Sequence, residues 1–282
     1  MKIGVVGSGI MGAGIAQALA QGSCNVVLYD VDPKSLNNGR ALIQSSLRRM
    51  LERQRISAAE MAAMWDRIAV TTEMEALASA NVIIEAVSEN MALKKKIFTS
   101  LDALCPTETI LATNTSSLSV SEIASVTSRP HRVIGMHFFN PVAVMKAVEI
   151  IRGCKTDSET LDSILEICGR IGKVPIIVAE SPGFVVNRLL TPMINEAIGI
   201  LAEGGALAAD IDNAMKYGAN HPIGPLELAD LIGNDTVLSI METLYAEFGD
   251  PKYRPHPLLK KMVRADRLGK KTGSGFYDYQ QG

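Results

Sequence analysis

The 282-residue chain contains few cysteines, and its four stand far apart in the sequence. Cys24, Cys105, Cys154 and Cys168 form no Cys-x-x-Cys pair, so neither a disulfide framework nor a zinc cluster is indicated. Most of them lie in apolar segments, where a thiol is typically buried. We therefore expect reduced thiols, no metal site and a cytoplasmic protein.

Long apolar runs and an excess of charge of one sign are also missing. No uncharged apolar stretch reaches the roughly 18 residues that indicate a membrane-spanning helix. The first apolar strand begins at Lys2, which leaves no room for a cleaved signal peptide. With a net charge of −2, the chain has no overall attraction to nucleic acid or to an anionic membrane. We expect it to bind neither, so any polyanionic ligand must meet a local basic patch.

No internal repeat or low-complexity tract interrupts the chain, and 47% of its residues are hydrophobic, which is enough for a large core. Short apolar runs alternate with helical segments. They occupy residues 2–7, 25–30, 68–71, 81–86, 109–112, 132–136, 146–151 and 173–178. This alternation predicts an α/β fold with a mostly parallel sheet, covered by helices on both faces.

One connection is longer than a simple crossover. Residues 34–67 have helical periodicity without a strand of their own, which predicts a helical hairpin that projects from the sheet. Its arms are expected at residues 40–55 and 58–67, with a break near Ser57. We assign residues 1–182, including this hairpin, to a Rossmann-type dinucleotide-binding domain.

Every element predicted after residue 182 is a helix. Ser181 is the expected N-cap and Pro182 suits the first helical position of an apolar helix, which is expected from about Phe184 to Glu203 and ends at Gly204-Gly205. Further helices are expected at about 207–218, 225–232, 234–248 and 256–265. Residues 183–282 are therefore predicted to form an all-α substrate and dimerisation domain. The basic, glycine-rich segment after Gly269 fits either a docked terminal loop or a functional one.

The most informative segment is the glycine-rich turn after the first strand. Gly7 permits a tight turn, Gly9 allows backbone N–H groups to approach a pyrophosphate, and Gly12 allows the following helix to pack closely on the sheet. Ile10 and Met11 lie within this turn and are expected to contact the same ligand. The turn predicts a dinucleotide site, although a plain glycine-rich connector is the alternative.

Asp30 indicates which dinucleotide binds. It closes the second apolar strand, where a carboxylate can accept hydrogen bonds from both ribose hydroxyls of NAD. The same charge repels the 2′-phosphate of NADP, and no arginine follows directly to compensate for it. We therefore predict NAD as the cofactor.

A nicotinamide needs a group that exchanges a proton as the hydride moves, and His137 is the best candidate. It follows a predicted strand, where open sheets place ligands, and imidazole titrates close to neutral pH. Glu149 lies in a strand otherwise fit for burial, where an unpaired carboxylate is costly. If the chain turns at Asn140-Pro141, Glu149 returns beside His137 and orients its ring. The alternative is that Glu149 points outward on an edge strand.

Two further polar groups are candidates for holding a substrate oxygen. Ser116 comes just after the strand at 109–112, although it can equally be a helix cap. Asn187 lies near the start of the helix that opens the second domain, on a polar stripe with Thr191 and Asn195. This places an amide at the domain boundary, where pockets commonly form, although a capping or interhelical hydrogen bond is the alternative.

Five motifs, taken together, resemble one family. They are Gly7-Ser-Gly9-Ile-Met-Gly12-Ala-Gly14-Ile-Ala-Gln17, Asn114-Thr-Ser-Ser-Leu, His137-Phe-Phe-Asn-Pro-Val, Ser181-Pro-Gly-Phe-Val-Val-Asn187-Arg-Leu and the terminal Gly-Lys-Lys-Thr-Gly-Ser-Gly-Phe-Tyr. In this order they resemble the L-3-hydroxyacyl-CoA dehydrogenase family over essentially the whole chain. The short bacterial members of that family are of the 3-hydroxybutyryl-CoA dehydrogenase type.

The resemblance implies roles for the candidate residues. His137 is then the general base and Glu149 its partner, while Ser116 and Asn187 contact the substrate oxygen. Asn140 belongs to the same pocket.

The resemblance also implies further cofactor contacts. Glu89 and Lys94 are similar to residues that hold the nicotinamide-side ribose, whereas their position in the sequence alone predicts a solvated helix start. Asn114, in the motif that contains Ser116, is expected beside the cofactor.

A substrate attached to coenzyme A carries a pyrophosphate and a 3′-phosphate, both of which need cations. Arginines cluster on the first arm of the predicted hairpin, at Arg40, Arg48, Arg49, Arg53 and Arg55. We expect Arg40, Arg48 and Arg49 to bind these phosphates, although a solvated charged face is the alternative. No lysine follows Lys34 on this arm, so the contacts need not match those of relatives that use lysine.

The implied activity is the reversible, NAD-dependent oxidation of a (3S)-3-hydroxyacyl-CoA, with 3-hydroxybutyryl-CoA as the expected substrate. The resemblance also implies that the protein is a homodimer. Acyl chain length and physiological direction are open. One alternative is a dehydrogenase of a free small acid or sugar acid, against which the basic hairpin and the His-Phe-Phe-Asn-Pro segment argue. The other is a dinucleotide-sensing or structural protein without turnover, against which the presence of His137, Glu149, Ser116 and Asn187 argues.

Overall fold

The computed structural model describes residues 1–279, and the chain divides into two compact units after Ser181. The first unit contains the strands β1 (Lys2–Val6), β2 (Asn25–Tyr29), β3 (Ile68–Thr71), β4 (Val82–Glu85), β5 (Ile110–Thr113), β6 (Val133–Phe138), β7 (Ala147–Arg152) and β8 (Val174–Ala179). Its α-helices are α1 (Ile10–Gln21), α2 (Pro33–Glu52), α3 (Ala58–Asp66), α4 (Met91–Leu104), α5 (Val120–Ala124) and α6 (Ser158–Arg170).

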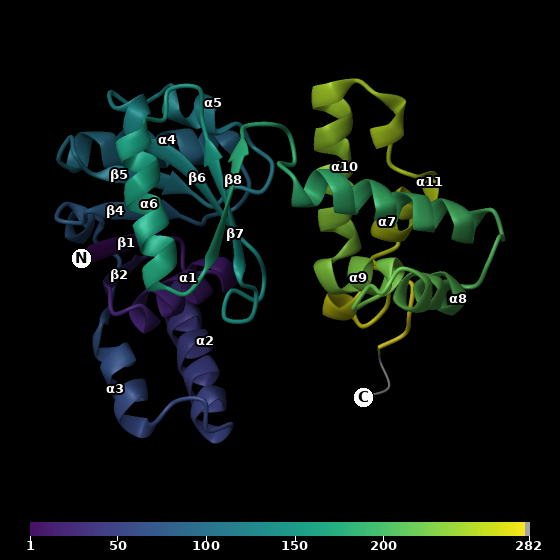
Figure 1. The fold of residues 1–282 in the computed structure, drawn as a ribbon, viewed down its shortest axis with the longest axis horizontal. Coiled ribbons are helices and arrows are strands. Elements are labelled where there is room, and N and C mark those ends of the chain that lie inside the picture. The colour runs from purple at the N-terminus through teal and green to yellow at the C-terminus, as the bar shows by residue number, and fades with distance from the viewer. Residues whose placement is uncertain (280–282) are drawn as a thin grey trace. The chain divides into compact units, whose positions relative to one another are not determined.

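The strands form one sheet in the order β3-β2-β1-β4-β5-β6-β7-β8 (Figure 1). Neighbouring strands are parallel except for β6 and β7, which are antiparallel. The predicted mostly parallel α/β fold is therefore confirmed. Because the strand order reverses between β1 and β4, the carboxyl ends of these two strands mark the place where open α/β sheets bind ligands.

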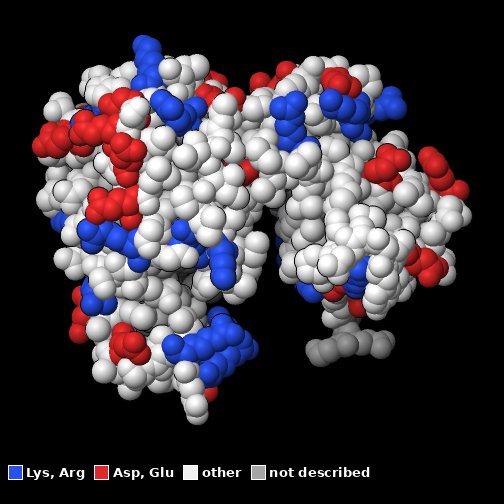
Figure 2. Space-filling view, in the orientation of Figure 1, with Lys and Arg blue, Asp and Glu red and all other residues white. Residues whose placement is uncertain are grey.

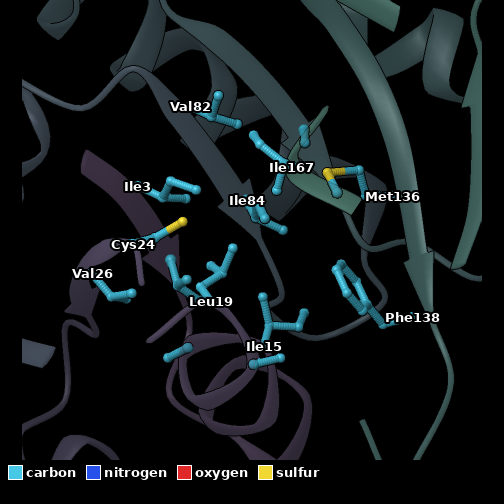
Figure 3. Close-up of a cluster of buried hydrophobic side chains, with 14 of the residues drawn as sticks. Ile3, Ile15, Leu19, Cys24, Val26, Val82, Ile84, Met136, Phe138 and Ile167 are labelled. Atoms are coloured by element: carbon cyan, nitrogen blue, oxygen red, sulfur yellow. The ribbon is translucent and has the colours of Figure 1, made fainter. Parts of the chain in front are cut away.

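Alternate residues of the strands point to opposite faces of the sheet, and both faces are buried. On one face the strand residues pack against α1 and α6, as Figure 3 shows for Ile3, Ile15, Leu19, Cys24, Val26, Val82, Ile84, Met136, Phe138 and Ile167. On the other face Leu77 and Ile83 crowd Gly4, whose added Cβ would lie 2.7 Å from Leu77 Cδ2. The continuous apolar sequences of the central strands follow from this two-sided burial.

Helices α2 and α3 form the predicted hairpin and project from the sheet (Figure 1). The first arm begins at Pro33, earlier than expected, because Asp32 caps it and proline suits the first helical position. The break near Ser57 is confirmed. Ser57 and Glu60 form a reciprocal capping box there, which starts α3.

The second unit is built from helices, as predicted: α7 (Val186–Ala202), α8 (Ala208–Asn213), α9 (Pro225–Ile232), α10 (Asn234–Phe248) and α11 (Pro257–Arg264). A cap at Ser181 and a helix start at Pro182 are wrong. Gly183 and Phe184 have φ angles of 70° and 51°, a left-handed conformation that a right-handed helix excludes. Helix α7 therefore begins only at Val186. Within residues 1–279, no helix is both long and apolar enough to cross a membrane.

Residues 270–279 form a docked loop. The buried carboxylate of Asp230 accepts hydrogen bonds from the N–H groups of Phe276 and Tyr277, both at 2.9 Å, and from the Tyr279 hydroxyl at 3.1 Å. Gly275 approaches this carboxylate so closely that an added Cβ would lie 1.9 Å from Asp230 Oδ1. The close approach of the backbone to Asp230 explains why this segment needs glycine at position 275.

The four cysteines are all free thiols, and three of them are buried. Cys154 is exposed in the loop after β7, so the expected burial is wrong for this one residue. Burial raises the pKa of Cys168 to about 11, which leaves little thiolate at neutral pH. Burial also raises the pKa values of Cys24 and Cys105.

We expect one thiol per chain to react quickly with Ellman's reagent in neutral buffer, because only Cys154 is exposed among the four. All four should react in denaturant. In the variant Cys154→Ser the fast phase should disappear, and a second fast thiol in that variant would contradict the described packing.

Candidate active site

The glycine turn between β1 and α1 leaves the N-terminus of α1 open. Gly7 has a φ angle of 96°, which favours glycine, and an added Cβ at Gly12 would lie 1.8 Å from the Gly7 carbonyl oxygen. At Gly9, in contrast, an added Cβ would meet no atom within 4 Å. Gly9 is the N-cap and offers no capping side chain, and Ile10 beside it is exposed. The N–H groups and the positive end of the helix dipole thus suit a phosphate.

Asp30 stands at the carboxyl end of β2, next to this turn. Its Oδ2 accepts hydrogen bonds from the N–H group and the hydroxyl of Ser8, at 2.8 and 2.7 Å. Its Oδ1 accepts one from the Asp32 N–H at 3.1 Å. Ser8 is buried and holds the carboxylate where a ribose bound along the turn would meet it. Ser8 is not among the predicted site residues, although its place between two glycines of the turn was a usable signal.

His137 and Glu149 lie directly opposite each other on the antiparallel strands β6 and β7. The distance from His137 Nδ1 to Glu149 Oε2 is 2.8 Å, and the two residues are 6% and 0% exposed. The interpretation of Glu149 as an outward residue of an edge strand is wrong, because β7 lies between β6 and β8. His137 itself is inside β6 rather than after it, because the strand extends to Phe138.

Ser116 lies in the loop that follows β5. The carboxylate of Glu89 accepts hydrogen bonds from the Thr115 hydroxyl at 2.6 Å and from the N–H and hydroxyl of Ser116 at 2.8 and 3.1 Å. Burial raises the pKa of Glu89, but the Lys94 ammonium and these hydrogen bonds outweigh it and hold the pKa below its usual range. Ser119, rather than Ser116, caps helix α5, so the capping interpretation of Ser116 is wrong.

Lys94, in the first turns of α4, is 1% exposed, so a solvated helix start is wrong for this residue. Its Nζ lies 2.7 Å from Glu85 Oε1 and 3.4 Å from Glu89 Oε2. Glu85 closes β4 and is 0% exposed. It is absent from the predicted site, although an acid at the end of an apolar strand is the same signal that identifies Asp30.

The remaining polar candidates divide between the two units. Asn114 Oδ1 accepts a hydrogen bond from the Phe138 N–H at 2.9 Å, which links the loop after β5 to β6. Asn140 is exposed just beyond β6. Asn187 belongs to the second unit, in the first turn of α7, and its carbonyl oxygen accepts the Thr191 hydroxyl at 2.7 Å. The first unit therefore holds all the predicted site residues except Asn187.

The arginines predicted for coenzyme A are exposed on α2, where Figure 2 shows a concentration of Lys and Arg side chains. Arg40 and Arg48 are separated by roughly 12 Å along the helix axis, and Arg48 and Arg49 point roughly 100° apart. The Arg40 guanidinium also lies 5.2 Å from the ring centroid of Trp65 in α3. These residues stand on the hairpin rather than at the strand ends that carry Asp30 and His137.

A glycine turn at a helix N-terminus, an acid that closes the second strand and a buried histidine–carboxylate pair are the features of a dinucleotide-dependent dehydrogenase. Residues 2–181 match the family model of the 3-hydroxyacyl-CoA dehydrogenase NAD binding domain, and residues 183–279 match that of the C-terminal domain. The chain belongs to the 3-hydroxyacyl-CoA dehydrogenase family. The family prediction and NAD as the cofactor are thereby confirmed.

Individual relatives match over essentially the full length. The chain is 53% identical to the 3-hydroxybutyryl-CoA dehydrogenase of Clostridioides difficile over 281 residues, which cover 100% of both chains. Its structure resembles that of (S)-3-hydroxybutyryl-CoA dehydrogenase PaaH1 from Ralstonia eutropha, with a TM-score of 0.95, 49% identity and 99% of both chains covered. It also resembles FadB2 of M. tuberculosis, with a TM-score of 0.97, 39% identity and 98% of both chains covered.

Gly9→Ala tests the cofactor site without disturbing the fold. The added Cβ meets no atom of the protein and enters the space in front of α1, so Tm should stay unchanged while NADH binding weakens. The loss of one hydrogen bond to a charged phosphate corresponds to roughly a tenfold to hundredfold rise in Kd. Gly169→Ala, where the Cβ also meets no atom, is the matched control. Equal NADH affinity in both variants would place the dinucleotide elsewhere.

Proposed function

We propose that this protein catalyses the reversible, NAD-dependent oxidation of (3S)-3-hydroxybutyryl-CoA to acetoacetyl-CoA. The observation that carries the proposal is the buried His137–Glu149 pair, with 2.8 Å between Nδ1 and Oε2, in a unit that matches the NAD binding domain of the family. Full-length relatives named 3-hydroxybutyryl-CoA dehydrogenase support the acyl-CoA substrate.

His137 acts as the general base in this proposal. The Glu149 carboxylate accepts a hydrogen bond from Nδ1–H, which leaves the lone pair of Nε2 to take the hydroxyl proton of the substrate. The negative charge of Glu149 then stabilises the imidazolium that forms. The NAD that the glycine turn and Asp30 would hold would supply the hydride acceptor for C3. In the reverse direction His137 returns its proton to the oxygen.

The substrate oxygen is held by Ser116 and Asn187, with Asn140 in the same pocket. A serine hydroxyl can rotate, so Ser116 can turn its hydrogen from Glu89 towards a substrate oxygen. Asn187 supplies an amide from the second unit. The oxygen is thus positioned by groups that carry no net charge.

The cofactor is held by Gly7, Gly9 and Gly12 with the neighbouring Ile10 and Met11, and by Asp30, Glu89, Lys94 and Asn114. The open N-terminus of α1 suits the pyrophosphate and Asp30 suits the adenosine ribose. Glu89 and Lys94 are assigned to the nicotinamide-side ribose. The first unit thus supplies the cofactor contacts of the proposed mechanism.

The second unit contributes to substrate binding and to a homodimer, and the protein acts in the cytoplasm. Leu207, Tyr217 and Leu231 are exposed apolar side chains of this unit, as a subunit interface requires.

Purified protein should oxidise NADH with acetoacetyl-CoA, which is followed by the absorbance of NADH. Free acetoacetate and NADPH are the controls and should give little turnover. His137→Ala should lower kcat by about 10²–10⁴ while NADH still binds, because the variant loses its general base and the proposed cofactor contacts are elsewhere. Full turnover in that variant would remove His137 from the mechanism. If the unaltered protein binds NADH but turns over neither substrate, a sensor is favoured instead. If it turns over free acetoacetate, a free-acid dehydrogenase is favoured.

The exposed arginines of α2 are proposed ligands of the coenzyme A phosphates. Removal of Arg48 should raise KM for acetoacetyl-CoA by about threefold to tenfold and leave kcat unchanged, since a phosphate contact remote from C3 contributes equally to ground and transition states. Arg40→Ala and Arg49→Ala are tested in parallel. Arg170→Ala, which removes an exposed arginine from α6, is the control. If none of the three raises KM more than Arg170→Ala does, the hairpin does not hold the phosphates.

A further inference from the structure

Glu85 has no role in the chemistry proposed above, yet it is as fully buried as Glu149, with 0% of its surface exposed. Its Oε1 accepts hydrogen bonds from Lys94 Nζ and from the Val87 N–H, both at 2.7 Å. Its Oε2 accepts one from the Thr113 hydroxyl, also at 2.7 Å. A fully buried carboxylate is costly without partners, and here both oxygens are satisfied. The three donors come from the end of β5, from α4 and from the turn between β4 and α4.

The Lys94 ammonium links Glu85 to a second carboxylate. It lies 2.7 Å from Glu85 Oε1 and 3.4 Å from Glu89 Oε2, so one cation stands between two acids. The other oxygen of Glu89, Oε1, accepts hydrogen bonds from the backbone N–H groups of Ser116 and Ser117 at 2.8 and 3.1 Å. A continuous set of charge-assisted contacts therefore runs from Glu85 to the loop that carries Ser116.

We propose that Glu85 is a positioning residue for this loop. By holding the Lys94 ammonium it determines where Glu89 lies, and Glu89 in turn holds Ser116 where its hydroxyl meets the substrate oxygen. The inference rests on the proposed function, because it assumes that Ser116 contacts that oxygen. Glu85 acts through Lys94 and Glu89 and does not touch the reacting atoms.

The physical reason is an unequal competition for one cation. With Glu85 charged, Lys94 is drawn away from Glu89, and Glu89 Oε1 stays with the loop. Without that charge the ammonium keeps only a neutral hydrogen bond at position 85, so its charge attraction to Glu89 dominates and draws the Glu89 carboxylate towards α4. The loop then loses part of the acceptor that fixes it, and the Ser116 hydroxyl moves away from its productive position.

Glu85→Gln is the variant that removes the charge and keeps the shape. The amide oxygen of the substituted side chain would still accept from Lys94 and Val87, and the Thr113 hydroxyl can rotate to accept from its NH₂ group. We therefore expect a folded protein. Glu122→Gln is the matched control, because it removes a 2.7 Å ion pair between Glu122 and Lys95 that joins α4 to α5 outside this set.

The test measures kcat and KM with acetoacetyl-CoA, the Kd of NADH, and Tm. Glu85→Gln should lower kcat by about 10- to 100-fold, the effect of a misplaced contact, whereas Glu122→Gln should leave it unchanged. In a protein that already carries Ser116→Ala, Glu85→Gln should lower kcat by less than about threefold, because the effects of residues that act as a unit are not additive.

Additive losses in the double variant would overturn the proposal, and so would a loss that appears only in the Kd of NADH or only in Tm. If Glu85→Gln does not fold, Glu85→Asp provides the test. The shorter side chain keeps the charge but withdraws it from Lys94 Nζ, which lies 2.7 Å from Glu85 Oε1, so kcat should fall, and an unchanged kcat would overturn the proposal. Failure of the unaltered protein to turn over acetoacetyl-CoA would be a failure of the proposed function instead.

Discussion

A carboxylate taken out of water needs a cation or several hydrogen-bond donors beside it, and the sheet of the first unit carries two fully buried ones and a third that is half-buried. Asp30, Glu85 and Glu149 each stand on or at the end of a strand that is otherwise apolar. Their partners come from three different elements: the glycine turn, helix α4 and strand β6. The requirement to satisfy these acids thus brings distant parts of the chain together at one end of the sheet, and the candidate active site consists largely of the groups that satisfy them.

The antiparallel pairing of β6 and β7 is the second constraint. In an otherwise parallel sheet it allows a short return, so that His137 and Glu149 become directly opposite neighbours. A slip of one residue in this register would move Glu149 to the other face of the sheet and leave a buried charge without its partner. Ile150 and Ile151 point to opposite faces of the sheet and are both fully buried, so the packing on both faces opposes such a slip. Packing therefore maintains the geometry of the His137–Glu149 pair.

The second unit uses buried acids differently. Asp212 accepts hydrogen bonds from the N–H groups of Leu226 and Glu227 at 2.8 and 2.9 Å, and so caps the start of α9. Burial, followed by the hydrogen bond to Asp212, raises the pKa of Tyr277, which keeps its hydroxyl protonated as a donor. Asp230 fastens the terminal segment in the same way. These acids stabilise helix ends and a docked loop. The contacts of that loop explain why a second glycine-rich segment, near the end of the sequence, belongs to the motif pattern of the chain.

The sequence by itself determined the local features of this protein. The tertiary structure decided which side chains from distant parts of the chain pair with one another. The strands, the hairpin break at Ser57 and the Gly7–Gly12 turn were predictable, because apolar periodicity, capping and glycine conformations act over a few residues. The pairing of Glu149 with His137 was accessible too, because burial of a lone carboxylate demands a partner. The burial of Lys94 could not be predicted in this way, since a lysine at a helix start is solvated unless the rest of the fold covers it. Only the assembled sheet placed Glu85 beside that lysine, because their contact depends on the packing of α4 against the ends of β4 and β5 rather than on any pattern along the chain.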